Sequence, residues 1–181
     1  MRVITGSARG RRLKELEGLE TRPTTGKVKE ALFSVIQFDI EGRRVLDLFA
    51  GTGQLGIEAL SRGAESAVFV ERRKDALQAI RENLEACGFS DRARVVNGDA
   101  MSYLKSGEKF DLIFLDPPYA SGLLQRALED IARFDICRRH GIIVAESAAD
   151  QALPPLSGPY SIYREYRYGK IKLTVYHRNE D

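Results

Sequence analysis

Short apolar runs alternate with amphipathic segments through the middle of the chain. The runs predicted to be strands are residues 44–49, 67–71, 93–97, 110–116 and 141–146. Between these runs, apolar residues recur at helical spacing in residues 55–61, 74–87, 101–105 and 122–134. Because a strand–helix–strand alternation packs helices on both faces of a parallel sheet, the pattern predicts a doubly wound α/β fold.

Both ends of the chain break this alternation. Residues 1–20 are expected to form a small hairpin, and residues 25–38 a helix. Near the other end, residues 161–168 and 170–177 flank Gly169, and their alternating apolar and polar positions predict an antiparallel hairpin. With these two strands the expected sheet has seven strands and is mainly parallel.

Length and composition limit the class of protein. A chain of 181 residues, 43% hydrophobic and 30% charged, fits one globular domain. The apolar runs are too short to span a membrane, and no export signal follows Met1. Cys87 and Cys137 form neither a metal-ligand pattern nor a disulfide framework. We therefore expect a cytoplasmic monomer with reduced thiols, no metal site and no membrane contact.

Basic residues are unevenly distributed along the chain. The net charge is only +2, yet residues 1–14 contain no acidic residue. The basic residues of this segment are Arg2, Arg9, Arg11, Arg12 and Lys14. A basic arm on a mildly acidic body predicts an anionic partner such as nucleic acid, although a solvated tail would have the same composition.

A glycine-rich loop follows the first predicted strand. Gly51, Gly53 and Gly56 have the G-x-G-x-x-G spacing, and Glu71 lies where a carboxylate can bind ribose hydroxyls. The strand before the loop and the helix after it favour a nucleoside-cofactor site over a corner that merely requires glycine. A pyrophosphate would bind at the helix N-terminus, whereas Asp47, before the loop, suits the ammonium group of S-adenosylmethionine.

Acidic residues also follow the third and fourth predicted strands. Asp99 is placed to accept a hydrogen bond from an adenine amino group, or to cap a helix that starts there. The tetrapeptide Asp-Pro-Pro-Tyr occupies residues 116–119, directly after the apolar run 112–115. Because proline cannot donate to a sheet ladder, this tetrapeptide is a strand-ending turn at the least. It also combines a carboxylate acceptor, a rigidly held carbonyl and a ring that can stack on a base.

Taken in order, these motifs resemble those of Rossmann-like class I S-adenosylmethionine-dependent amino methyltransferases. Arg-Pro-Thr-Thr at 22–25 with the helix pattern after it, the opening residues 1–10 and the closing residues 168–173 resemble the RsmD-type enzymes more specifically. Those enzymes methylate the N2 amine of one guanine in bacterial small-subunit (16S) ribosomal RNA. Gly26 and Lys27 depart from the family pattern, in which an acidic residue and an arginine are expected.

The resemblance covers essentially the whole chain and implies roles for individual residues. Asp116 and the Pro117 carbonyl would accept hydrogen bonds from the amine, with Pro118 fixing the backbone and Tyr119 stacking on the base. The implied cofactor contacts are Asp47, Phe49, Ala50, Gly51, Thr52, Gly53, Gly56, Glu71, Arg72, Asp99 and Ala100. The implied RNA contacts are Arg9, Arg11, Arg12, Lys14, Arg22, Thr24, Thr25, Lys27 and Lys29.

The expected organisation is one compact unit with two parts. Residues 1–40 would form an RNA-binding extension, and residues 41–181 the methyltransferase domain. Because the chain is short, we expect the RNA to be presented in a partly assembled small subunit with bound ribosomal proteins. Thr24 and Thr25 would equally serve as helix caps, and the tyrosines of the C-terminal hairpin are more typical of strand packing than of RNA contact.

Other functions share parts of these motifs. The same chemistry could act on an adenine N6 amine or a protein glutamine amide, although an aspartate at 116, where such enzymes often have asparagine, favours guanine. A nicotinamide dehydrogenase would share the glycine loop and Glu71 but has no use for the tetrapeptide 116–119. A non-catalytic RNA-binding module would need only the basic arm.

Overall fold

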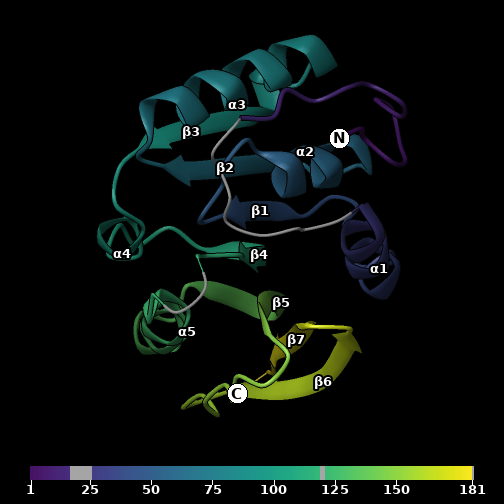
Figure 1. Ribbon diagram of the computed structural model, residues 1–181. Coiled ribbons are helices and arrows are strands. Elements are labelled where there is room, and N and C mark those ends of the chain that lie inside the picture. The colour runs from purple at the N-terminus through teal and green to yellow at the C-terminus, as the bar shows by residue number, and fades with distance from the viewer. Residues whose placement is uncertain (17–25, 119–120, 181) are drawn as a thin grey trace.

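A single sheet of seven strands organises the computed structural model, which describes residues 1–16, 26–118 and 121–180 (Figure 1). The strands are β1 (Arg44–Asp47), β2 (Ser66–Glu71), β3 (Ala93–Asn97), β4 (Phe110–Leu115), β5 (Cys137–Ala148), β6 (Tyr160–Tyr168) and β7 (Ile171–Arg178). The helices are α1 (Gly26–Val35), α2 (Gln54–Ser61), α3 (Lys74–Cys87), α4 (Ala100–Tyr103) and α5 (Leu123–Phe134), with a 3-10 turn, η1 (Ser90–Arg92).

The strand order confirms the predicted fold class. It runs β3-β2-β1-β4-β5-β7-β6, with β1 to β5 parallel to one another and β7 antiparallel to both of its neighbours. From β1 the chain first builds outward through β2 and β3, then returns to add β4 on the other side. In such open sheets, ligands bind at the carboxyl ends of the strands where the order reverses, which here is between β1 and β4.

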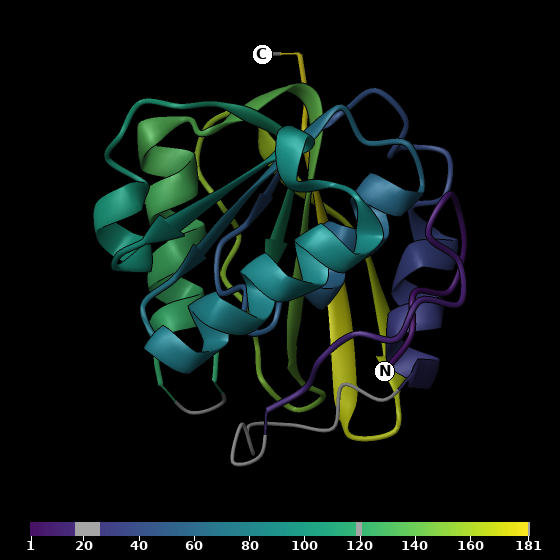
Figure 2. The ribbon, with the colours of Figure 1, turned by 90° about the horizontal axis from the view of Figure 1, so that it is seen from above.

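Each face of the sheet packs against its own apolar core. Helices α1, α2 and α3 cover one face, where the rings of Phe33 and Phe114 lie 5.6 Å apart between centroids. Helices α4 and α5 cover the other face, where Leu128 is fully buried with Ile113. Figure 2 shows α1 and the N-terminal segment on the side of the sheet opposite α5. Neighbouring residues of β4 therefore serve opposite cores, as a strand requires.

Several element boundaries differ from those predicted. The strands expected at 44–49 and 110–116 end at Asp47 and Leu115, because the loop and the prolines that follow cannot continue the ladder. The strand expected at 141–146 is longer in both directions. Its pairing with β7 continues to Ala148, and its start at Cys137 is separated from the rest by a register shift between Cys137 and Ile142.

The two ends of the chain match their predicted outlines in the described residues. The C-terminal hairpin is present as β6 and β7. In the N-terminal segment, residues 1–16, Arg2 and Arg12 form an antiparallel bridge, and the Val3 N–H donates to the Arg11 carbonyl at 2.9 Å. The helix expected at 25–38 ends at Val35. Within the described ranges, no helix has the length and apolar character needed to cross a membrane.

Candidate active site

A cavity of about 630 Å³ opens at the carboxyl ends of β1, β2, β3 and β4. It lies at the point where the strand order reverses. It brings together nine of the predicted cofactor contacts, which are Asp47, Phe49, Ala50, Gly51, Thr52, Glu71, Arg72, Asp99 and Ala100. Asp116 and Pro118 line the same cavity. The predicted cofactor motif and part of the predicted catalytic motif therefore share one space.

Asp47 is the deepest acid of this cavity. It ends β1, is only 2% exposed, and accepts a hydrogen bond from the Gly56 N–H at 3.0 Å. Burial raises the pKa of Asp47 to about 7, and the neighbouring carboxylates Asp116 and Glu71 act in the same direction, while the Gly56 hydrogen bond opposes them. A buried carboxylate of this kind is poised to become ionised when a cation binds beside it.

The glycines of the loop have different tasks. Gly51 and Gly53 have positive φ values of 58° and 86°, which glycine adopts at little cost, and Gly53 precedes the first turn of α2. At Gly56, an added Cβ would lie 2.3 Å from Cε2 of Phe69 on β2, so only glycine lets α2 pack this closely on the sheet. Gly53 and Gly56 do not line the cavity. In the structure they shape the loop and let α2 pack on the sheet, and their role as cofactor contacts stays a prediction.

Glu71 fixes the loop from the neighbouring strand. One carboxylate oxygen accepts from the Gly51 N–H at 3.0 Å, and the other from the backbone N–H groups of Arg72 and Arg73, each at 3.0 Å. The carboxylate is thereby held in one orientation at the cavity wall. Each oxygen has further lone pairs, so Glu71 can also accept from the hydroxyls of a ribose.

Asp99 caps a helix, which is one of its two predicted roles. Its Oδ2 accepts from the Ser102 backbone N–H at 3.0 Å and so caps the short helix α4. That hydrogen bond is the main reason that the pKa of Asp99 is lowered, and Arg72, 3.9 Å from Oδ1, adds to the effect. The residue also lines the cavity. An ionised, oriented carboxylate at this position can accept a hydrogen bond from an amino group.

Asp116 lies farther out than Asp47. The Cα of Asp47 pairs with that of Phe114, so Asp116 stands two residues beyond this level, just past the end of β4. It is half-buried, whereas Pro117 behind it is buried and Pro118 is exposed. Tyr119 lies outside the described residues, so its predicted stacking role stays a prediction.

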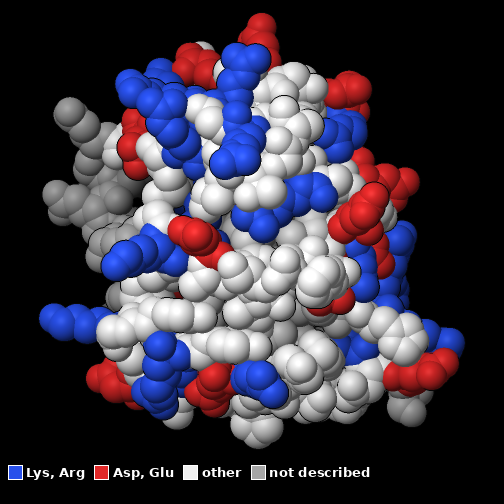
Figure 3. Space-filling view, turned by 90° about the vertical axis from the view of Figure 1, so that its right-hand side faces the viewer, with Lys and Arg blue, Asp and Glu red and all other residues white. Residues whose placement is uncertain are grey.

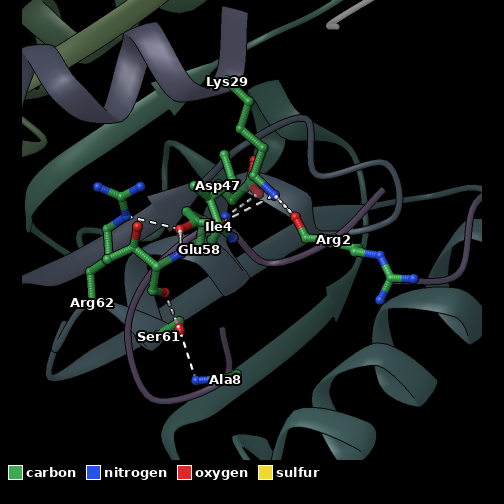
Figure 4. Close-up of polar contacts among 10 residues, drawn as sticks. Arg2, Ile4, Ala8, Lys29, Asp47, Glu58, Ser61 and Arg62 are labelled. Atoms are coloured by element: carbon green, nitrogen blue, oxygen red, sulfur yellow. Dashed lines mark hydrogen bonds and ion pairs between the residues drawn. The ribbon is translucent and has the colours of Figure 1, made fainter. Parts of the chain in front are cut away.

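The N-terminal segment packs closely against α2. The Glu58 carboxylate of α2 accepts from the backbone N–H groups of Ile4 at 2.8 Å and Thr5 at 3.1 Å (Figure 4). One turn later, Ser61 accepts from the Ala8 N–H and donates to the Thr5 carbonyl. These contacts fix residues 4–8 against the same helix that begins at the glycine loop.

The same segment also reaches the cavity, which sequence reasoning missed. Lys14 exchanges backbone hydrogen bonds with the Asn83 side chain of α3, and Asn83 Nδ2 donates to the Thr52 carbonyl of the glycine loop. Glu15 and Leu16, directly after, line the cavity. The charges and glycines of the segment predict a basic hairpin, and no local pattern marks Asn83 as the residue that anchors it.

Besides Lys29, five of the predicted RNA contacts lie in the part of the chain that the structure describes. Arg9, Arg11 and Arg12 are exposed around the turn of the N-terminal segment. Figure 3 shows the right-hand side of the molecule in Figure 1, with Lys and Arg side chains gathered over its upper part. Lys14 is exposed but pairs with Glu82 of α3 at 2.8 Å. Lys27 is exposed at the start of α1. The remaining predicted contacts, Arg22, Thr24 and Thr25, lie outside the described residues.

The prediction of Lys29 as an RNA contact is wrong. Its side chain is fully buried, and its Nζ lies 3.3 Å from the Glu58 carboxylate and donates to the Arg2 carbonyl at 3.3 Å (Figure 4). Burial lowers the pKa of Lys29, and the ion pair with Glu58 opposes that shift. Glu58 also binds the Arg62 Nε at 2.9 Å. Lys29 therefore joins α1 to α2 inside the protein.

Comparison with known proteins identifies relatives over nearly the whole chain. Residues 1–177 match the family described as Conserved hypothetical protein 95. The Ribosomal RNA small subunit methyltransferase D of Escherichia coli strain K12 is 35% identical over 179 residues, which are 98% of this chain and 90% of that protein. A solved structure of the Escherichia coli protein yhhF, 35% identical, superposes with a TM-score of 0.90 and covers 100% of this chain and 99% of that one.

A more distant structure shares the fold. The RNA methyltransferase from Salinibacter ruber, solved in complex with S-adenosyl-L-homocysteine, is 16% identical and has a TM-score of 0.66. The match covers 88% of this chain and 95% of that protein. At this identity the likeness establishes the architecture of the sheet alone.

Proposed function

This chain belongs to the ribosomal RNA small subunit methyltransferase D family and is an S-adenosylmethionine-dependent methyltransferase, and on that premise we propose that its acceptor is the N2 amine of a guanine in small-subunit ribosomal RNA. The observation that carries the proposal is the placement of Asp47 and Asp116 in one cavity, at the ends of adjacent parallel strands. One acid suits a cationic donor, and the other suits an amine.

The residues of the cavity fit the cofactor. When bound, S-adenosylmethionine supplies a methyl group on a sulfonium, which is already an excellent leaving group. Asp47 would bind the positively charged amino-acid end, Glu71 the ribose hydroxyls, and Asp99 the adenine amino group. The support for this arrangement is Asp47 itself. Its pKa is raised to about 7, and its charged form is stabilised when a cation, not an anion, binds beside it.

The chain's own contribution to transfer is mainly positional. An exocyclic guanine amine is a poor nucleophile because its lone pair is delocalised into the ring. Asp116 and the Pro117 carbonyl would accept hydrogen bonds from the two N–H groups of the amine. This favours a pyramidal nitrogen, with its lone pair directed toward the methyl group. The methylated nitrogen is cationic and loses a proton readily, so Asp116 acts as an acceptor and proton relay and need not be a strong base.

RNA capture is assigned to the exposed arginines of the N-terminal segment. Arg9, Arg11 and Arg12 are exposed and would contact phosphates, which gives salt-dependent binding with little sequence information. The finer expectations, a partly assembled small subunit with bound ribosomal proteins as substrate, a monomer and a cytoplasmic location, are part of this proposal.

Membership of the family decides against the dehydrogenase and the non-catalytic module. Among acceptors, the aspartate at 116 favours guanine over adenine or glutamine amides. Methyl transfer from labelled S-adenosylmethionine to naked ribosomal RNA, assembled small subunits and duplex DNA, measured in parallel with the modified base identified, tests this choice. Label on guanine N2 of small-subunit RNA is the expected result, and label on adenine or only on DNA would contradict it.

A further inference from the structure

The end of β5 places a second carboxylate beside Asp116. Strands β4 and β5 run parallel and side by side, and the Cα of Leu115 pairs with that of Ala145 (Figure 1). The next residues, Asp116 and Glu146, therefore occupy equivalent positions at the same edge of the sheet. Glu146 is only 4% exposed. The proposed transfer step does not use it.

Glu146 also lines a small hollow next to the catalytic motif. The hollow has a volume of about 70 Å³, and its wall includes Pro117, Pro118 and Gln151 as well as Glu146. Pro118 lines both this hollow and the cofactor cavity. The two spaces thus adjoin at one proline, with the cofactor cavity on one side and the Glu146 hollow on the other.

We propose that Glu146 determines the choice of guanine as acceptor by accepting a hydrogen bond from the guanine N1–H. This inference rests on the proposed function, because it places the N2 amine at Asp116. On the Watson–Crick edge of guanine, the N1–H donor is next to the N2 amine. Adjacent strands are about 4.8 Å apart, so carboxylates at equivalent positions on β4 and β5 lie close enough to reach two neighbouring donors on one base.

The chemistry of the pair gives a strong preference. A carboxylate accepts a charge-assisted hydrogen bond from N1–H, whereas adenine presents an N1 lone pair at that position, which would repel the carboxylate. A site built to pair with a donor rejects a base that lacks it, because the acceptor then faces a lone pair in place of an N–H group. Asp116 would select for a base with an amine, and Glu146 for guanine, whose ring has an N1–H donor.

A base analogue separates the two roles. 2,6-Diaminopurine keeps the N2 amine but has a lone pair in place of N1–H. Once the methylated guanine is mapped, ligated small-subunit RNA carrying guanine or diaminopurine at that position can be compared by kcat/KM. We expect the wild-type enzyme to prefer guanine by about 10²-fold or more. In Glu146→Gln, whose amide can donate to the analogue's N1, the preference should fall at least about tenfold, with the affinity for S-adenosylmethionine within about twofold of wild type.

The matched control is Glu129→Gln on α5. Glu129 is exposed and accepts only from Gln125 at 3.0 Å among the contacts of the described chain, so its substitution should leave the base preference unchanged. An unchanged preference in Glu146→Gln, or an equal loss in Glu129→Gln, would overturn the inference. If Glu146→Gln fails to fold, the wild-type enzyme still decides, because equal rates on guanine and diaminopurine would exclude N1–H recognition. Failure of the proposed function is distinct, since wild-type enzyme would then not methylate guanine N2 at all.

Discussion

The carboxyl ends of β1 and β4 hold two aspartates with different surroundings. Asp47 is buried under the glycine loop and receives a backbone hydrogen bond from Gly56, whereas Asp116 is half-buried and is followed by two prolines. The first lies in the cavity with Glu71 and Asp99, and the second lines the same cavity next to Pro118, which also borders the hollow of Glu146. The two aspartates thus meet different partners on adjacent strands, because Asp116 lies two residues farther along the strand direction than Asp47.

The comparison implies that the two sides can be disabled separately. Substitutions on the cofactor side should change S-adenosylmethionine binding, and substitutions on the acceptor side should change transfer or RNA binding. The following predictions run from the largest expected effect to the smallest.

Asp116→Ala should reduce kcat about 10³-fold, because the amine loses the acceptor that orients its lone pair. S-adenosylmethionine affinity, measured by calorimetry, should stay within about twofold, since the cofactor side is intact. Full activity in this variant, or a parallel loss of cofactor binding, would remove the distinction between the two aspartates.

Lys29→Met tests whether Lys29, which was predicted to contact RNA, instead stabilises the fold. Its removal leaves Glu58 buried without its ammonium partner, so the free energy of unfolding should fall by about 3 kcal/mol. Denaturant unfolding measures this loss. The control is Lys27→Met, an exposed lysine on the same helix, for which a change below about 0.5 kcal/mol is expected. Equal stability of the two variants would mean that the internal ion pair contributes nothing.

Asp47→Asn should weaken S-adenosylmethionine binding about 30-fold, because the side chain can still accept from Gly56 but has lost its charge. At saturating cofactor, kcat should be close to that of the wild type. A large fall in kcat with unchanged affinity would instead give Asp47 the role assigned to Asp116.

Simultaneous substitution of Arg9, Arg11 and Arg12 by alanine should weaken RNA binding about 20-fold and flatten its salt dependence. Cofactor affinity should not change, since these side chains are exposed and do not line the cavity. RNA binding titrated at several salt concentrations measures both effects. An unaltered salt slope would assign RNA capture to another surface.

The smallest effect is in the pH dependence of cofactor binding. The pKa of Asp47 is raised from its ordinary value of 3.8 to about 7 in the folded protein without cofactor. The folded state therefore holds this proton more tightly than the unfolded state, and the stabilising contribution present at low pH is lost as the pH rises through 7. A cationic ligand favours the ionised form, so affinity should rise about tenfold between pH 6 and pH 8. In Asp47→Asn the titration should be flat.

Much of this site was predictable because each motif is local. A strand, a glycine loop and a helix are specified by neighbouring residues, so Asp47 and Glu71 could be placed at strand ends, and Gly51 in the loop, from sequence pattern alone. Parallel pairing then brings those ends to one edge. The less accurate predictions concern residues whose role depends on distant partners. From its sequence neighbours, Lys29 is expected at the surface, but in the fold it is buried and paired with Glu58 of another helix.

The sequence by itself determined the fold class and the order of the motifs, because hydrophobic periodicity and turn residues act over a few positions. The expected cofactor followed from the resemblance of those motifs to a known family. Only the tertiary structure decided which charges are buried, how deep each carboxylate lies and which surfaces adjoin. It placed Glu15 and Leu16 in the cavity wall, Gly56 against Phe69, and Glu146 beside Asp116. Burial and register depend on chain segments that are far apart in sequence and meet only in the folded sheet.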